Sequence, residues 1–286
     1  MHKSLGFLKF RDIGIQVSMQ DSGRIGYAEY GIPESGFMDA VSAGRSNLLV
    51  GNPPGQACLE LFQGMASIEV SSACQVVFSG ASAQIRVNSV PYPLHQVITL
   101  KAGDVIQISA AVAGNWLYMA LAGIWDQRDY FGSKSFYKAI GGKAGFAVND
   151  RVGFYARSPH IQRSNARLNP SIFWSHPEIA AYAGPDFHLL DQNLIARLLN
   201  TSFQISNSIN RMGYQLEGTI LHKLPEILSA PVYPGTVQLT PSGRLIVLMK
   251  DAQVTGGYPR VLQLTPRGLA EFSQKRPGEK IKFRLH

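Results

Sequence analysis

Alternation of apolar and polar residues recurs in short segments along this 286-residue chain. Apolar residues occupy every second position from Ile13 to Met19 and again from Ile281 to Leu285. Because successive side chains of a β-strand point to opposite faces, this period predicts half-buried strands. The 28 glycines and 16 prolines interrupt the segments at close spacing, which is typical of all-β barrels and sandwiches. Further strands are predicted at residues 97–100, 105–108, 116–121 and 245–249.

Helices are expected to be few. In the segment 191–200, Leu194 and Leu198 fall on one face and Asp191 can cap the first turn. Pro266 would occupy the first position of another helix, where proline is favoured. The predicted helices cover residues 39–50, 191–200 and 265–274. The fold class predicted from these patterns is mainly β with a few short helices.

A change of composition divides the chain. Between Ser158 and Pro170, Pro, Ser, Asn and Arg replace the strand pattern, and we predict domains at residues 1–165 and 166–286. The flanks share a four-residue echo, because Arg24-Ile-Gly-Tyr27 resembles Arg211-Met-Gly-Tyr214. This echo hints at duplicated halves. Two related barrels facing each other would bring Arg24 and Arg211 towards a common cleft.

The bulk properties exclude several classes of protein. No stretch is long and apolar enough to cross a membrane, and Lys9, Arg11 and Asp12 interrupt the segment that a signal peptide would need. The two cysteines, Cys58 and Cys74, have no metal-binding spacing and imply no disulfide framework. We expect a cytoplasmic protein with buried thiols and no metal site.

The net charge of +8 does not by itself indicate nucleic-acid binding. The basic residues concentrate at 128–167 and 275–284, without a compact run and without aromatic residues in a recognised pattern. Solvated faces or contact with an anionic partner are therefore favoured over nucleic-acid binding.

The segment from Leu248 to Arg260 carries more polar chemistry than a turn needs. It follows an apolar run and combines an acid, a carboxamide, a hydroxyl, a phenol and two cations with a double glycine. Gly256-Gly257 allows the backbone a positive φ or lets a ligand approach closely. Lys250 can position or polarise a substrate, and Asp251 can act as a base or a cation-bridging acid. The segment is predicted to form a binding site.

Two further polar segments carry an arginine. Arg24 follows Asp21, and its planar guanidinium suits bidentate binding of a carboxylate or phosphate. Equally, Arg24 could pair with Asp21 or Asp39 and brace the loop. In the second half, Arg211 follows a run of asparagines and serines that supply donors and acceptors without fixed charge.

A carboxamide completes the predicted site. Gln238 interrupts an apolar strand, so that it either satisfies a core hydrogen bond or contacts an amide substrate. We assign catalytic roles to Asp21, Arg24, Arg211, Lys250 and Asp251. Substrate binding is assigned to Asn210, Tyr214, Gln238, Gln253, Thr255, Gly256, Gly257 and Tyr258. The chain has no Walker A, dinucleotide-binding, zinc-protease or serine-hydrolase motif, and so no self-contained site of these kinds.

Taken together, these motifs resemble the family of the 5-oxoprolinase C subunit, also called the KipA or allophanate-hydrolase-subunit-2 family. The chain also resembles the carboxyltransferase-type region of urea carboxylase. The matching pieces occur in the family's order and span nearly the whole chain; they are residues 20–26, 36–39, 47–52, 59–60, 183–186, 210–214, 234–238 and 251–259. The family usually has a small or polar residue at the position of Lys250 and a threonine at that of Val254.

The resemblance implies two cyclophilin-like β-barrel units in a cytoplasmic complex with the KipI-like B subunit and the A subunit of 5-oxoprolinase. Such complexes convert 5-oxoproline and ATP to glutamate, ADP and phosphate; ATP, shared with the B subunit, and Mg²⁺ are the cofactors expected. An amide is the expected small-molecule substrate, with no nucleic acid or membrane as partner. Two alternatives stay open. One is a KipA-type regulatory protein that antagonises a KipI-like inhibitor of a histidine kinase, and the other is an amide- or urea-activating component of a biotin-dependent carboxylase system.

Overall fold

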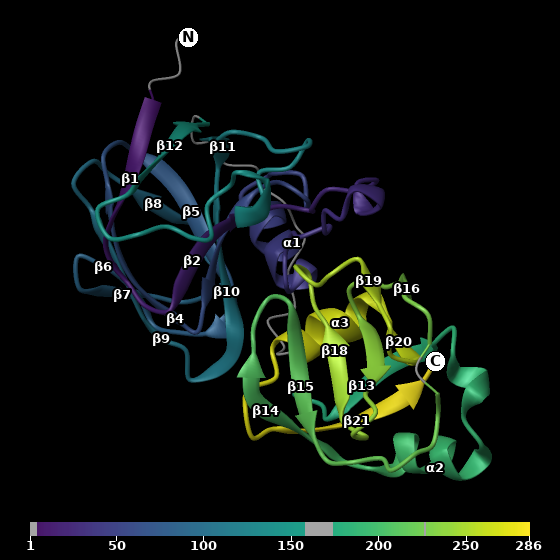
Figure 1. Ribbon diagram of the computed structural model, residues 1–286. Coiled ribbons are helices and arrows are strands. Elements are labelled where there is room, and N and C mark those ends of the chain that lie inside the picture. The colour runs from purple at the N-terminus through teal and green to yellow at the C-terminus, as the bar shows by residue number, and fades with distance from the viewer. Residues whose placement is uncertain (1–4, 158–173, 226) are drawn as a thin grey trace. The chain divides into compact units, whose positions relative to one another are not determined.

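The computed structural model describes residues 5–157, 174–225 and 227–286 (Figure 1). The chain divides into two compact units. The first contains the described residues among 1–24 and 35–171, and the second contains residues 25–34 and the described residues among 172–286. The predicted boundary between residues 165 and 166 lies outside the described residues.

The first unit is built from two sheets. The seven-stranded sheet has the order β11-β12-β1-β4-β9-β6-β7, with β1 Leu5–Ile13, β4 Gly64–Val70, β6 Ile85–Val87, β7 Val90–Tyr92, β9 Val105–Ala110, β11 Gly123–Asp126 and β12 Arg151–Ala156. The five-stranded sheet has the order β2-β3-β10-β5-β8, with β2 Gln16–Gln20, β3 Cys58–Phe62, β5 Cys74–Ser82, β8 Ile98–Leu100 and β10 Ala113–Leu121. A short 3-10 helix, η2, covers Lys138–Ile140.

The two sheets share one hydrophobic core. Phe10 from β1 and Ile68 from β4 meet Met19 from β2 and Leu117 from β10 in this core, and all four are fully buried. Both cysteines of the chain are free and buried in this unit. Removing these apolar side chains from water is the main force that holds the two sheets together.

The second unit is a closed barrel, drawn in green to yellow in Figure 1. Its strands follow the order β13-β20-β17-β18-β15-β14-β21, with β13 Glu178–Ala183, β14 Phe203–Ile209, β15 Gly213–Glu217, β17 Thr236–Leu239, β18 Leu245–Leu248, β20 Arg260–Leu264 and β21 Lys280–Leu285. The strands β13 and β21 pair in parallel, and the other pairs of the barrel are antiparallel. A separate two-stranded ribbon joins β16 Ala230–Pro231 to β19 Thr255–Gly256. The 3-10 helices η1 Ala28–Tyr30 and η3 Phe187–Leu189 also belong to this unit.

The three predicted α-helices are confirmed as α1 Ala40–Leu49, α2 Gln192–Asn200 and α3 Pro266–Ser273. Each begins after a side chain that accepts a backbone N–H of the first turn. Asp39 caps α1, Asp191 caps α2, and Thr265 caps α3 with Pro266 in the first turn. The mainly-β fold class is confirmed as well. Among the described residues, no helix has both the length and the apolar character to span a membrane.

Candidate functional site

The predicted polar segment begins where β18 ends, at the rim of the barrel. Two backbone bonds fix this segment against the β14–β15 turn. The amide of Met249 donates to the carbonyl of Met212 at 3.0 Å, and the amide of Asp251 donates to the carbonyl of Arg211 at 2.7 Å. The backbone on both sides of Lys250 is therefore held in place.

Arg211 and Asp251 form a bidentate ion pair. Nε of Arg211 donates to Oδ2 of Asp251 at 2.7 Å, and Nη2 donates to Oδ1 at 3.0 Å. Only 6% and 13% of the two side chains are exposed. Such a planar, two-point contact is strong and directional. Because the guanidinium engages both carboxylate oxygens, Asp251 orients Arg211.

Lys250 faces an acid that the sequence assignments missed. Its Nζ lies 4.0 Å from Oε2 of Glu34, and the exposed fractions of the two side chains are 18% and 40%. Glu34 ends the segment 25–34, which belongs to the second unit although the chain enters it from the first. No local pattern pairs Glu34 with a residue so far away in the chain, so the sequence alone did not reveal it.

Gln238 lies on β17, close to the double glycine. Its side chain is 2% exposed, and Nε2 donates to the carbonyl of Tyr258 at 3.4 Å. A Cβ at Gly256 would come within 2.5 Å of that Nε2. The space beside Gly256 is therefore taken by the Gln238 side chain, and the close approach of a ligand to the double glycine stays a prediction. The alternative, a positive φ, is wrong, because neither Gly256 nor Gly257 has one.

The remaining polar residues of the segment lie on or beside the β16–β19 ribbon. Gln253, Thr255 and Tyr258 are exposed. Ala230 pairs with Gly256 in the ribbon, and the carbonyl of Gly257 accepts a bond from the amide of residue 227 at 3.1 Å. The ribbon thus holds this group of side chains at the surface of the second unit.

Two residues assigned to substrate binding have partners within the barrel unit. Oδ1 of Asn210 accepts bonds from the amides of Met212 at 2.7 Å and Gly213 at 3.1 Å, which shapes the β14–β15 turn. Tyr214 is fully buried, and its hydroxyl donates to the carbonyl of Ser273 at 2.9 Å. A substrate contact by either residue stays a prediction.

A second arginine–aspartate pair stands at the other end of the segment. Nε of Arg260 donates to Oδ2 of Asp186 at 2.8 Å, Nη2 donates to Oδ1 at 3.2 Å, and Nη1 donates to the carbonyl of Pro231 at 2.9 Å. The Arg260 side chain lowers the pKa of Asp186 by hydrogen bonding, against the opposing effect of burial. Asp186 occurs in one of the motifs that suggested the family and Arg260 directly follows another, although neither was assigned to the site.

Asp21 and Arg24 hold a loop of the first unit. Oδ1 of Asp21 accepts bonds from the hydroxyls of Ser133 at 2.6 Å and Ser135 at 2.7 Å, and Oδ2 accepts the amide of Lys134 at 2.6 Å. Arg24 is 2% exposed and donates to the carbonyl of Ser135 at 2.5 Å. These bonds support the alternative in which Arg24 braces a loop. The guanidinium donates to the backbone carbonyls of Tyr130 and Ser135, at the two ends of the segment 130–135.

A buried hydrogen-bond network anchors the segment 36–39 in the first unit. The hydroxyl of Tyr118 donates to Oε2 of Glu60 at 2.8 Å and accepts the amide of Asp39 at 2.7 Å. The same Oε2 accepts the amide of Met38 at 2.9 Å. Burial raises the pKa of Tyr118, and so do the neighbouring acids. The family-like segment 36–39 is thus anchored by hydrogen bonds inside the first unit.

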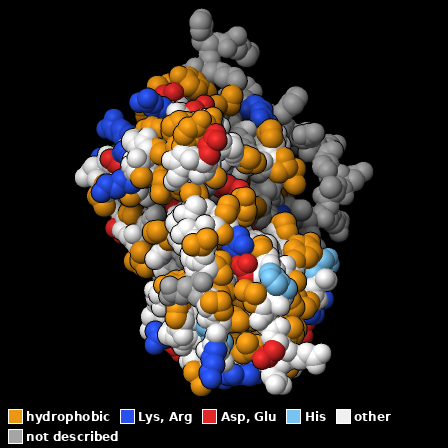
Figure 2. All heavy atoms as spheres, turned by 45° about the vertical axis from the view of Figure 1, so that its right-hand side comes forward, with side chains coloured by type: hydrophobic (Ala, Val, Ile, Leu, Met, Phe, Trp, Pro, Cys, Tyr) orange, Lys and Arg blue, Asp and Glu red, His pale blue; other side chains and the backbone are white. Residues whose placement is uncertain are grey.

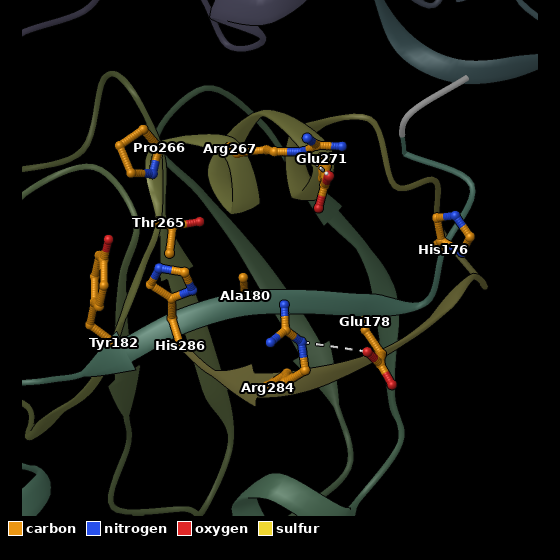
Figure 3. Close-up of a pocket in the computed structure, with 10 residues that line it drawn as sticks. All are labelled: His176, Glu178, Ala180, Tyr182, Thr265, Pro266, Arg267, Glu271, Arg284 and His286. Atoms are coloured by element: carbon orange, nitrogen blue, oxygen red, sulfur yellow. Dashed lines mark hydrogen bonds and ion pairs between the residues drawn. The ribbon is translucent and has the colours of Figure 1, made fainter. Parts of the chain in front are cut away.

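A pocket of about 580 Å³ lies elsewhere on the second unit (Figure 3). Its walls carry Arg284 and Glu178 from neighbouring strands and Arg267 and Glu271 from α3. Arg267 pairs with Glu271 at 2.9 Å and Arg284 with Glu178 at 3.6 Å. No residue assigned to the site lines this pocket.

On the face shown in Figure 2, lysine and arginine side chains occur in small groups among hydrophobic, acidic and uncharged ones.

Comparison with known proteins places this geometry in context. A family model described as carboxyltransferase domain, subdomain A and B, matches residues 30–285. The chain is 31% identical to the 5-oxoprolinase C subunit of Escherichia coli, over 96% of this chain and 90% of that protein. It is 27% identical to the 5-oxoprolinase C subunit of Haemophilus influenzae, over 95% of this chain and 89% of that protein.

The crystal structure of TTHA0988 is similar to this fold, with a TM-score of 0.86 and 27% sequence identity. The similarity covers 97% of this chain and 55% of that chain. This chain therefore spans about half the length of TTHA0988.

Proposed function

The chain belongs to the carboxyltransferase domain family, subdomain A and B, and on that premise we propose that it acts as the C subunit of an ATP-dependent 5-oxoprolinase. The reaction opens the lactam of 5-oxoproline to glutamate while ATP becomes ADP and phosphate. The two relatives named as C subunits of 5-oxoprolinase support the choice of substrate.

The Arg211–Asp251 pair is the observation that carries the proposal. An amide is a poor electrophile. Once its oxygen carries a phosphoryl group, water can attack the carbon, and negative charge builds on that oxygen as it leaves with phosphate. A guanidinium held in one orientation stabilises such charge without having to reorganise during the reaction. Asp251 supplies that orientation through two hydrogen bonds of 2.7 and 3.0 Å.

The neighbouring side chains complete the proposed site. Gln238 is buried and held by the carbonyl of Tyr258, so its carboxamide is preorganised to recognise an amide group. Lys250 adds a second cation next to Asp251 in the sequence. Gly256 leaves room for the Gln238 side chain, since a Cβ there would collide with it. In this proposal the chain binds and orients the lactam and stabilises charge on its oxygen.

We assign ATP and Mg²⁺ to the companion B subunit. The described part of this chain contains no group of three or more His, Cys, Asp or Glu side chains that could hold a metal ion. When bound there, ATP supplies the phosphoryl group that turns the lactam oxygen into a good leaving group. In this proposal no described residue of this chain is given a role in binding the Mg²⁺–nucleotide.

Exposed hydrophobic side chains around the ribbon support a partner surface. Leu228 is 93% exposed, Tyr233 is 56% exposed and Tyr258 is 37% exposed. These residues flank β16 or follow β19, the two strands of the ribbon beside the proposed site. Large aromatic and aliphatic groups of this kind anchor protein interfaces. We propose that the B subunit docks here.

Reconstitution tests the proposed function. The purified chain is mixed with the A and B subunits of the same source, and glutamate formation from 5-oxoproline is measured with and without ATP. We expect glutamate only when all three subunits and ATP are present. If the complete mixture forms no glutamate although this chain binds the B subunit, the enzymatic proposal fails and the KipA-type regulatory alternative gains support.

A further inference from the structure

The pocket shown in Figure 3 owes its shape to a small residue between two larger ones. Glu178, Ala180 and Tyr182 lie at alternate positions of β13 and line the pocket together, because successive side chains of a strand point to opposite faces. The methyl group of Ala180 leaves a space that the two larger side chains flank. Helix α3 packs directly on this strand, since a Cβ at Gly268 would come within 2.4 Å of the carbonyl of Ala180. The pocket of about 580 Å³ is therefore built into the packing of α3 against β13, and it is large enough for a small molecule.

Two opposite charges lie side by side on the strands of this pocket. Arg284 of β21 stands opposite Ala180 in the parallel strand pair, and its Nε lies 3.6 Å from Oε2 of Glu178. The exposed fractions of the two side chains are 58% and 61%. Among the described residues, neither side chain has another ion pair or hydrogen bond. The Nη groups of Arg284 and Oε1 of Glu178 can therefore contact a ligand while the pair itself stays intact.

A second guanidinium reaches the pocket from α3. Nε of Arg267 donates to Oε1 of Glu271 at 2.9 Å. The Arg267 side chain is 72% exposed and that of Glu271 only 14%, and no described residue bonds to the Nη groups of Arg267. Of the Arg, Lys, Asp and Glu side chains that line the pocket in the described part of the chain, the well-exposed ones are thus Arg267, Arg284 and Glu178.

We propose that this pocket binds an acidic α-amino acid, such as L-glutamate or L-aspartate. An α-amino acid carries its ammonium and carboxylate groups on one carbon atom, and Glu178 and Arg284 present the complementary charges next to each other. The ammonium group contacts Glu178, and the α-carboxylate contacts the Nη groups of Arg284, whose planar fork suits a carboxylate. The side-chain carboxylate contacts Arg267 on the wall formed by α3.

The same charges select against other small molecules. A phosphate group would bring negative charge to Glu178 without an ammonium group to offset it, and such a mismatch favours the zwitterionic ligand. The rings of Tyr182 and His286 meet edge to face, with centroids 5.4 Å apart, and line the pocket beside Ala180. This binding site does not depend on the proposed reaction, although L-glutamate is the product of that reaction.

An NMR titration of the whole chain, labelled with ¹⁵N, tests this inference. L-Glutamate is added, and the chemical shifts of the backbone amides are followed. We expect saturable shifts in β13, β21 and the first turn of α3. The dissociation constant should be about 1–10 mM, because contacts between exposed charges are weak.

Two further ligands separate the contacts. N-Acetyl-L-glutamate lacks the ammonium group, and L-glutamine lacks the second carboxylate. We expect Glu178→Gln to weaken the binding of L-glutamate by about three- to fivefold and not to weaken that of N-acetyl-L-glutamate. Arg267→Gln should weaken L-glutamate to a similar extent and leave L-glutamine unchanged. Arg284→Gln should weaken all three ligands, because each keeps the α-carboxylate.

Arg11→Gln is the matched control, because the Arg11–Glu69 pair is also exposed, at 50% and 35%, but lies in the first unit. This substitution should leave the affinity for all three ligands unchanged. The inference is overturned if L-glutamate causes no saturable shifts, if the shifts lie in the segment 251–258 instead, or if the three pocket variants bind L-glutamate as tightly as wild type. The titration uses neither ATP nor another subunit, so its result is separate from that of the reconstitution assay.

Discussion

Arginine–aspartate pairs are the main polar contacts at both ends of the segment 251–260. Arg211 pairs with Asp251, and Arg260 pairs with Asp186. Each pair joins a residue of this segment to an element far away in the chain. At the level of single residues, these pairs fix where the segment leaves the barrel and where it returns.

The Asp186–Arg260 pair should make stability depend on pH. The Arg260 side chain lowers the pKa of Asp186 in the folded state. The contribution of Asp186 to the free energy of unfolding is therefore fully present above the ordinary aspartate pKa of about 3.9, and it is lost as the pH falls through the lower folded-state pKa. We expect Asp186→Asn to lower the free energy of unfolding by about 2 kcal/mol at pH 7. The difference should shrink below about pH 4.

Denaturant unfolding at several pH values measures this difference. Glu178→Gln is the matched control, because the Arg284–Glu178 pair is longer and 58% and 61% exposed, and exposed pairs contribute little. A cost of Asp186→Asn that is the same at pH 3 and pH 7 would contradict the linkage.

The two cysteines should be unreactive in the folded protein. Burial raises the pKa of Cys74 to about 12 and raises that of Cys58 as well. Since the thiolate is the reactive form, neither thiol should react with Ellman's reagent at pH 8. In denaturant, both cysteines should react at once. Rapid labelling of the native chain would show that the core around β3 or β5 opens easily.

At the level of elements, alternation and caps predicted the strands and helices that carry a local pattern. Asp191 and Thr265 begin α2 and α3 as expected, because capping depends on neighbours within one turn. The strand β3 was not predicted, since four of its five residues are buried and leave no period of two. The ribbon β16–β19 has two residues on each side, too few for any pattern.

The double glycine offers a matched pair of substitutions at this scale. A Cβ at Gly256 would come within 2.5 Å of Nε2 of Gln238, whereas one at Gly257 would be 3.4 Å from the nearest atom, a backbone carbonyl. We expect Gly256→Ala to displace the Gln238 carboxamide and to lower kcat/KM in the reconstituted complex by about 10-fold or more. Gly257→Ala should retain most of the activity. Equal effects of the two substitutions would mean that Gln238 has no role in the site.

At the level of the whole molecule, the candidate site that we propose is carried by the second unit. Arg211, Asp251, Gln238 and Lys250 belong to it, while Asp21 and Arg24 brace a loop of the first unit. The sequence could not separate these roles, because Arg24 and Arg211 stand in nearly the same local motif and differ only in distant partners. A cleft shared by Arg24 and Arg211 stays a prediction.

Residue types in the sequence predicted most members of the candidate site, but not which of these side chains are in contact. Asp251 and Arg211 were assigned from polar residue types, and the structure brings them together at 2.7 Å. Tyr214 carried the same kind of evidence, yet it lies in the barrel core. Glu34 went unassigned, because its contact with Lys250 depends on a segment that joins the second unit from the other half of the chain.

The rate of glutamate formation by an Arg211→Gln complex tests the central claim most directly. The variant is compared with wild type and with Arg267→Gln in the presence of the A and B subunits, 5-oxoproline and ATP, and complex formation is checked by gel filtration. We predict that Arg211→Gln assembles normally but loses about 100-fold or more in kcat, while Arg267→Gln keeps the wild-type rate. An Arg211→Gln complex that forms glutamate at the wild-type rate would contradict the assignment of this site.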